Sequence, residues 1–209
     1  MVFRMAERKA KKPESSSRER VLAGATEEFA RYGFAGARID RIAQRVGLNV
    51  RMIYYHFGNK EGLYRGVLAA IYGEAADMLA RVAAEASPKR RSVEALGRYF
   101  DLLTSHPHFA DILVREYLDG GVHLARLFKE DPSLFENIHG RANALAAAAI
   151  ESGEVRPLPP AEAVVVVSSA ASFLWAARGV HELFLGRKPV AGEWKALMLD
   201  IFFNGLRPR

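Results

Sequence analysis

Residues 38–63 have the sequence RIDRIAQRVGLNVRMIYYHFGNKEGL. Apolar residues recur through it at helical spacing, and glycine or asparagine stands where each short run ends. A helix-turn-helix needs a small residue in its first helix, a residue tolerant of positive φ in the turn, and an apolar residue packing the second helix. Ala43, Gly47 and Ile53 supply these three in order, so residues 38–57 predict a helix-turn-helix.

Helices are predicted on both sides of this unit. Ser16 and Glu19 fit a capping box, which begins a helix that Gly33 ends. Asn49 is a natural N-cap for the third helix, and Lys60 opens a fourth that reaches about residue 85. Proline and glycine then separate helical segments predicted over residues 92–105, 107–118, 121–129, 133–152, 160–186 and 192–206. Strand patterns are lacking, so the predicted fold class is all-α.

Positive charge is confined to the N-terminal third. Residues 1–65 hold 14 Lys and Arg against 7 Asp and Glu, or +7, whereas residues 66–209 hold 16 against 17, or −1. A basic end on a near-neutral body suits phosphate binding coupled to a second task, although a merely solvated tail is the alternative. We therefore expect three parts: a disordered basic tail (1–14), a DNA-binding domain (15–75), and a helical regulatory and dimerisation domain (76–209).

Composition limits the chemistry. The chain has no cysteine, which removes disulfides, thiolate metal sites and a cysteine nucleophile, and which suits the cytoplasm. The longest uncharged stretch, residues 163–177, is shorter than the roughly 20 residues of a membrane span. His106 and His108 lack the i, i+4 spacing of a helical zinc site, and no catalytic motif is present. We expect no membrane contact, no catalytic residue, no metal and no cofactor.

The outer face of the third predicted helix suits a DNA groove. Arg51, Met52 and Tyr55 point outward, with Tyr54 and His56 on the flanks. Arginine can bond guanine through two hydrogen bonds, methionine can contact a thymine methyl, and a tyrosine hydroxyl can reach a phosphate. The alternative is that both tyrosines pack on the first helix. Beyond this helix, the Lys60 ammonium and the N–H groups of its helix end could hold a phosphate.

The N-terminal part resembles the TetR family of bacterial transcriptional regulators. The resemblance spans residues 20–69 and rests on FARYGF (29–34), Ile42-Ala43, Gly47-Leu48 and IYYHFGNKEGL (53–63), which is similar to the family's Tyr-x-x-Phe-x-x-Lys signature. The resemblance implies a set of DNA contacts. Val50, Arg51 and Met52 would approach base edges, Tyr54, His56 and Lys60 would hold phosphates, and Tyr55 would do either.

Two residues depart from the family pattern. Ala37 stands where the family often has a threonine cap for the second helix, and we expect Arg38 to replace the lost backbone contact or to reach the groove. Arg51 is longer than the small residue commonly found at its position. We expect this residue to alter the choice of operator.

The C-terminal two thirds are expected to dimerise and to bind a ligand. A single helix-turn-helix unit makes too few DNA contacts to bind an operator tightly, so a homodimer on palindromic half-sites is expected. The predicted dimer interface, with an intramolecular core as the alternative, contains Phe173, Trp175, Phe184, Trp194, Met198 and Phe202. The pocket implied by the resemblance would be lined by Phe109, Leu113, Arg115, Tyr117, His123, Phe128, His139 and Asn143.

The leading functional hypothesis is a dimeric repressor that releases operator DNA when an unknown small molecule binds. Repression is the family default, and a transcriptional activator is an alternative. A second class is an architectural or nonspecific DNA-binding dimer that relies on its basic tail. A third is a small-molecule-binding or enzymatic helical protein with a helix-turn-helix shape.

Overall fold

The computed structural model describes residues 16–87 and 90–205, so the predicted tail lies outside the described residues. Within these ranges the chain is helical and contains no strand, which confirms the all-α class. The elements are α1 (Ser17–Gly36), α2 (Ile39–Val46), α3 (Val50–Phe57), α4 (Lys60–Glu85), α5 (Arg91–Ser105), α6 (Pro107–Leu118), α7 (Val122–Glu130), α8 (Pro132–Phe135), the π-helical turn η2 (Glu136–Gly140), α9 (Arg141–Glu151), α10 (Pro160–Ala176), α11 (Arg178–Leu185) and α12 (Ala191–Gly205).

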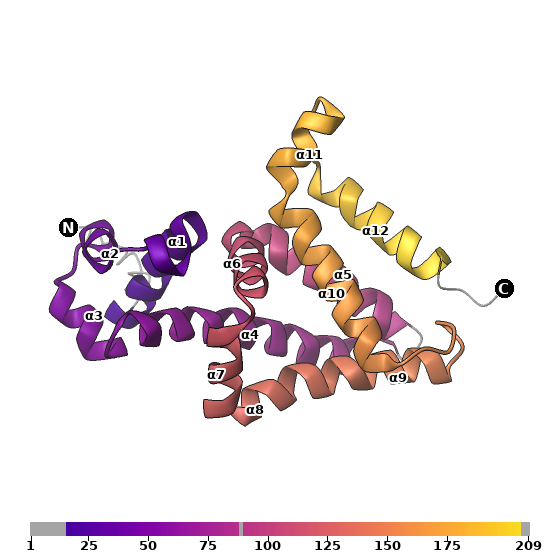
Figure 1. Ribbon diagram of the computed structural model, residues 1–209. Coiled ribbons are helices and arrows are strands. Elements are labelled where there is room, and N and C mark those ends of the chain that lie inside the picture. Colours follow the sequence, from indigo (N-terminus) through magenta and orange to yellow (C-terminus); the bar gives the residue numbers. More distant parts are fainter. Residues whose placement is uncertain (1–15, 88–89, 206–209) are drawn as a thin grey trace, which may run out of the picture.

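The first three helices form a compact N-terminal unit (Figure 1). The predicted capping box is confirmed, because Ser16 and Glu19 each accept a hydrogen bond from the other's backbone. Gly33 breaks the helical dihedrals at φ 67°, although α1 resumes to Gly36. Asn49 caps α3 by accepting from the Arg51 N–H, as predicted. These local side-chain caps fix where the short helices begin.

Helix α4 joins this unit to the body, which comprises α5–α12 (Figure 1). Its bounds agree with the prediction, and Asn59 caps its first turn by accepting from the Gly62 N–H. Leu63 and Val67 near its start and Val82 near its end are fully buried. One continuous apolar core follows α4 from the N-terminal unit into the body.

The prediction of one helix over residues 160–186 was wrong. The chain breaks at Ala177 into α10 and α11, which bend by 68°. Arg178 holds the break, since its guanidinium bonds both oxygens of Asp111 on α6, at 3.0 and 3.3 Å, and the Trp175 carbonyl. Among the described helices none is by itself long and apolar enough to cross a membrane, and only this bent pair together meets that length and composition.

The predicted helix over residues 133–152 is also interrupted. Four residues of α8 lead into the π-helical turn η2 before α9 begins at Arg141. A π-turn rotates the following side chains relative to a regular helix and is frequent at functional sites. Here it carries His139 on the side of the body that faces α4.

Candidate nucleic-acid interface and cavity of the body

The predicted helix-turn-helix scaffold is confirmed. Ala43 and Ile53 are buried, and Gly47 adopts φ 64° between α2 and α3. Glycine tolerates this left-handed backbone because it has no Cβ. A further close approach was missed in the sequence: a Cβ on Gly24 of α1 would collide with the Val46 side chain of α2. The three helices therefore hold α3 at a fixed angle.

Helix α3 turns Ile53 inward and presents a mixed polar and aromatic face outward. Arg51 is exposed, as are Met52 (37%), Tyr54 (46%) and Tyr55 (81%). The alternative in which both tyrosines pack on α1 does not fit these exposures. A rigid helix that exposes large side chains without a partner indicates a binding surface.

Three other predicted contact residues point back into the unit. Val50 packs against the core. His56 Nε2 lies 2.8 Å from the Ser17 hydroxyl. The Lys60 ammonium donates to the Ala35 carbonyl at 3.1 Å and lies 4.9 Å from the Phe34 ring centroid. Holding a phosphate would require Lys60 to leave this carbonyl.

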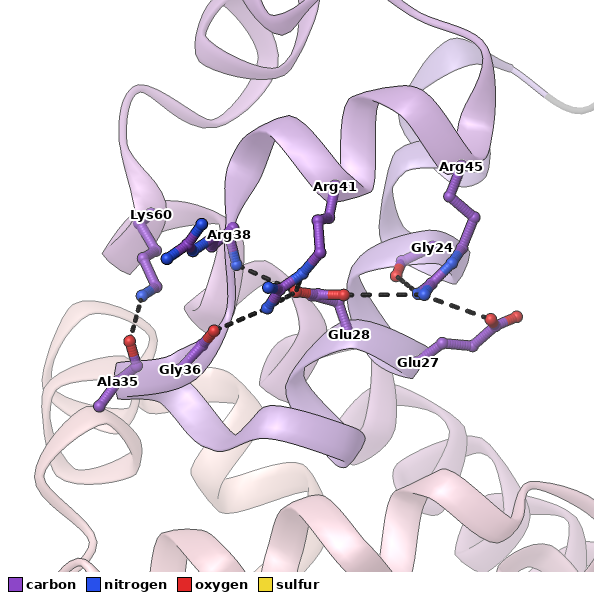
Figure 2. A network of polar contacts seen from close by, with 9 residues as sticks. All are labelled: Gly24, Glu27, Glu28, Ala35, Gly36, Arg38, Arg41, Arg45 and Lys60. Carbon is purple, nitrogen blue, oxygen red and sulfur yellow. Dashed lines mark hydrogen bonds and ion pairs between the residues drawn. The ribbon is translucent and has the colours of Figure 1, made fainter.

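A buried carboxylate joins α1 to α2 (Figure 2). Glu28 is fully buried, and its Oε1 accepts from the Arg38 backbone N–H at 3.1 Å and from Arg41 Nε at 2.7 Å. Arg45 lies 3.7 Å from the other carboxylate oxygen, and Arg41 also donates to the Gly36 carbonyl at 2.8 Å. Sequence reasoning missed this network. The only sign of the network in the sequence is that Glu28 stands at helical spacing from Val21 and Ala25, on an otherwise apolar face.

Glu28 binds the backbone at the start of α2, a helix that has no side-chain cap. Burial alone raises the pKa of Glu28, but hydrogen bonds from Arg41 and Arg38 outweigh it and hold the pKa below its ordinary value of 4.5. The carboxylate is therefore ionised at neutral pH and satisfies an N–H at the start of α2. The Arg38 side chain itself makes no capping bond and is exposed. Its contact with DNA stays a prediction.

The body contains an apolar cavity of about 220 Å³ between α4, α5, α6, η2, α9, α10 and α12. Of the predicted pocket residues, Phe109, Leu113, Tyr117 and His139 line it. Tyr72 on α4 and Tyr99 on α5 also line it and were missed, because the sequence alone does not show which faces of separate helices meet.

The other four predicted pocket residues lie outside the lining. Phe128 packs behind it, against the rings of Tyr72 and His139. The His123 ring packs on Phe34 of α1 at 4.3 Å, between the body and the N-terminal unit. Arg115 reaches toward Gly33 in the same contact, and Asn143 is half-buried on α9.

The outer side of α10–α12 carries an exposed apolar face. Of the predicted interface residues, Phe173 (59%) and Phe184 (83%) are exposed. Trp194 and Met198 are buried within the chain, and Trp175 and Phe202 are half-buried, so these four leave little surface for a partner. Further exposed apolar side chains on these helices are Val165, Val166, Val180, Leu183, Leu185, Leu197 and Ile201. In Figure 1, α11 lies at the far end of α10, and α12 runs back from it.

The family model described as "Bacterial regulatory proteins, tetR family" matches residues 21–67, the part of the chain that contains α2, α3 and the Glu28 network. The N-terminal unit is a TetR-family helix-turn-helix domain. Relatives of the chain include the HTH-type transcriptional repressor NicS of Pseudomonas putida, 28% identical over 201 residues that cover 91% of this chain and 92% of that protein.

Solved structures share the fold over nearly the whole chain. The transcriptional regulator SCO4942 of Streptomyces coelicolor has a TM-score of 0.69 at 23% identity and covers 92% of this chain and 100% of its own. The regulator FadR of Bacillus subtilis, solved in complex with stearoyl-CoA, has a TM-score of 0.66 at 16% identity, with coverage of 90% and 99%. At these identities the likeness extends to the fold alone.

Proposed function

We propose that this chain is a sequence-specific DNA-binding regulator of the TetR family, a repressor that acts as a dimer and releases its operator when a small molecule binds the body. The observation that carries this proposal is the outer face of α3. Its inner residue Ile53 is 1% exposed, whereas Tyr55 two positions later is 81% exposed. The scaffold fixes the helix, and the exposed side chains include the arginine that suits guanine.

Dimerisation would use the exposed apolar face of α10–α12. Monomeric proteins rarely leave an apolar surface of this kind uncovered. This face also contains a shallow groove of about 410 Å³, which is lined by residues that include Leu174, Phe184, Leu197 and Ile201. A two-fold dimer would place two copies of α3 on successive half-sites of a palindrome.

Release would follow from linkage between the cavity and α3. A ligand shifts a conformational equilibrium by its differential affinity for the two states. Helix α4 contributes both to the cavity wall and to the core of the N-terminal unit, so a ligand that moves α4 also moves α3. The stearoyl-CoA complex of FadR, which shares this fold, supports a ligand role for the body.

The test is selection of bound sequences from random DNA by the full chain. The proposal expects an enriched palindrome whose half-sites lie about one helical turn, ~10 base pairs, apart. A protein that enriches no motif would overturn the proposal. The architectural alternative would then be favoured, and a chain lacking residues 1–14 would lose nearly all binding. Under the regulator hypothesis the same deletion would change the salt dependence and keep the motif.

A further inference from the structure

The chemistry of the cavity in the body restricts its ligand. The lining is dominated by aliphatic and aromatic side chains, and none of its described residues is Asp, Glu, Lys or Arg. The polar side chains of the lining are all uncharged or able to be neutral, namely Tyr72, Ser92, Tyr99, Tyr117, His139 and Ser168. A buried ion needs a partner of opposite charge, and this lining supplies none.

The wall of the cavity extends along α4. The α4 residues in its wall run from Ile71 to Leu79, which is about 12 Å at 1.5 Å per residue. Its volume of about 220 Å³ far exceeds the ~10–15 Å³ that one water needs. The walls are apolar, so the space suits an apolar molecule better than a chain of waters.

Hydrogen-bonding groups gather at the end of the cavity nearer the N-terminal unit. Tyr72 is the α4 residue next to this end, and the Phe128 ring contacts both Tyr72 and His139, at 5.2 and 5.6 Å. Tyr117 is 41% exposed, and it lies close enough to Tyr72 to help raise that residue's pKa, after burial. The polar end is therefore built from α4, α6 and the π-helical turn.

His139 is the most versatile of these groups. Burial lowers its pKa below the ordinary 6.5, against the opposing effect of Glu136, so the ring is neutral at physiological pH. A neutral imidazole offers one donor and one acceptor to a bound molecule. In contrast, the Tyr99 hydroxyl already bonds Ser172 at 2.7 Å.

We propose that the cavity binds an uncharged, largely apolar small molecule whose carbonyl or hydroxyl group is held by Tyr117 and His139. This assignment rests on the proposed ligand-responsive function and names the class of its effector. Carboxylates and amines of the same skeleton are rejected, because their charge would be buried without a counter-charge.

Calorimetric titration of the full chain at pH 7.5 with three naphthalene derivatives tests the assignment. They are 2-acetylnaphthalene, which is neutral, 2-naphthoate, which is an anion, and 2-(aminomethyl)naphthalene, which is a cation. The ketone is expected to bind at least tenfold more tightly than either ion. Equal or tighter binding of an ion, or binding of none of the three, would overturn the assignment.

Two sets of variants locate the binding. Ala146→Phe fills the cavity and should abolish ketone binding, with Ala146→Leu as the milder change, whereas Ala170→Phe, in the groove of α10–α12, should leave it unchanged. His139→Leu and Tyr117→Phe should each weaken the ketone about fivefold and leave 2-ethylnaphthalene, which lacks the polar group, unaffected. Loss of binding in the groove variant alone would contradict the assignment.

The titration contains no DNA, so its outcome is independent of operator binding. A protein that binds the ketone selectively but enriches no DNA motif would keep the ligand class and overturn the regulator. A protein that enriches a palindrome but binds the ions as tightly as the ketone would keep the regulator and overturn the ligand class.

Discussion

The core between α1 and α2 contains an ionised carboxylate, whereas the core of the body contains an apolar cavity. In the N-terminal unit, Glu28 is held by a backbone N–H and by Arg41, and Gly24 brings two helices into close contact. In the body, tyrosines and aliphatic side chains surround the apolar cavity. The two regions differ in what they have to provide.

A helix that reads DNA must be presented at one angle, and directional hydrogen bonds with close backbone contacts fix an angle well. A ligand site needs room, and a core that leaves room loses packing energy in the wall around it. The comparison therefore implies that polar or steric damage to the N-terminal unit is costly, whereas filling space in the body is tolerated.

The largest expected effect on stability is that of the substitution Glu28→Ala. It leaves Arg41 Nε and the Arg38 backbone N–H, at the start of α2, without their acceptor, and it should lower the free energy of unfolding by about 3 kcal/mol. Glu27→Ala is the matched control. Glu27 is the next residue, 56% exposed and 3.6 Å from Arg45, so its loss should cost less than about 1 kcal/mol. Equal losses in urea titrations of the two variants would contradict the role of Glu28.

Two glycines of α4 test the comparison, because Gly62 lies against the N-terminal unit and Gly73 lies in the body. A Cβ on Gly62 would overlap the Phe57 carbonyl at the end of α3, so Gly62→Ala should cost about 2 kcal/mol and weaken DNA binding. Gly73, in the body, has nothing within 4 Å of such a Cβ. Gly73→Ala should therefore raise stability by about 1 kcal/mol through helix propensity. Thermal unfolding of both variants measures the difference, and stabilisation by Gly62→Ala would refute the close contact.

A smaller effect is expected on the outer face of α3. Tyr54→Phe removes a hydroxyl proposed to bond a phosphate, so operator affinity should fall by about 1 kcal/mol, or roughly fivefold. Unfolding should be unchanged, because Tyr54 is 46% exposed. Tyr117→Phe makes the same chemical change in the body and should leave affinity for DNA unaltered. A fall in DNA affinity for both variants would point to a general loss of structure.

The smallest expected effect concerns pH. Burial raises the pKa of Glu28, but the hydrogen bonds from Arg41 and Arg38 and the charges of Arg41 and Arg45 together hold it below the ordinary 4.5. Its contribution is therefore complete above about pH 4.5 and is lost as the pH falls through the folded-state pKa. The stability gap between the wild type and Glu28→Gln should be constant from pH 7 to 5 and should narrow below pH 4.5. A gap that widens in acid would contradict this sign.

The sequence predicted best what short-range chemistry determines. The starts of α1, α3 and α4 were predicted correctly because Ser16, Asn49 and Asn59 cap their own helices. Gly47 supplied the turn for the same reason. Each of these residues acts on neighbours within a few positions, so its pattern is visible without the fold.

Features made by distant partners were not predicted. The break at Ala177 has no proline, and it depends on Asp111, 67 positions away from Arg178. The pairing of Glu28 with Arg41 requires α1 and α2 to be packed already. Half of the predicted pocket residues missed the lining, since their helices were expected but the faces that meet were unknown.

The most direct test of the account is a repeat of the DNA selection with Arg51→Ala. If α3 reads base edges, the variant should enrich a palindrome with the same spacing but without preference at one base pair in each half-site. Its affinity for the wild-type operator should fall by about 1–3 kcal/mol per half-site. An unchanged motif with unchanged affinity would contradict the central claim that α3 is the reading helix.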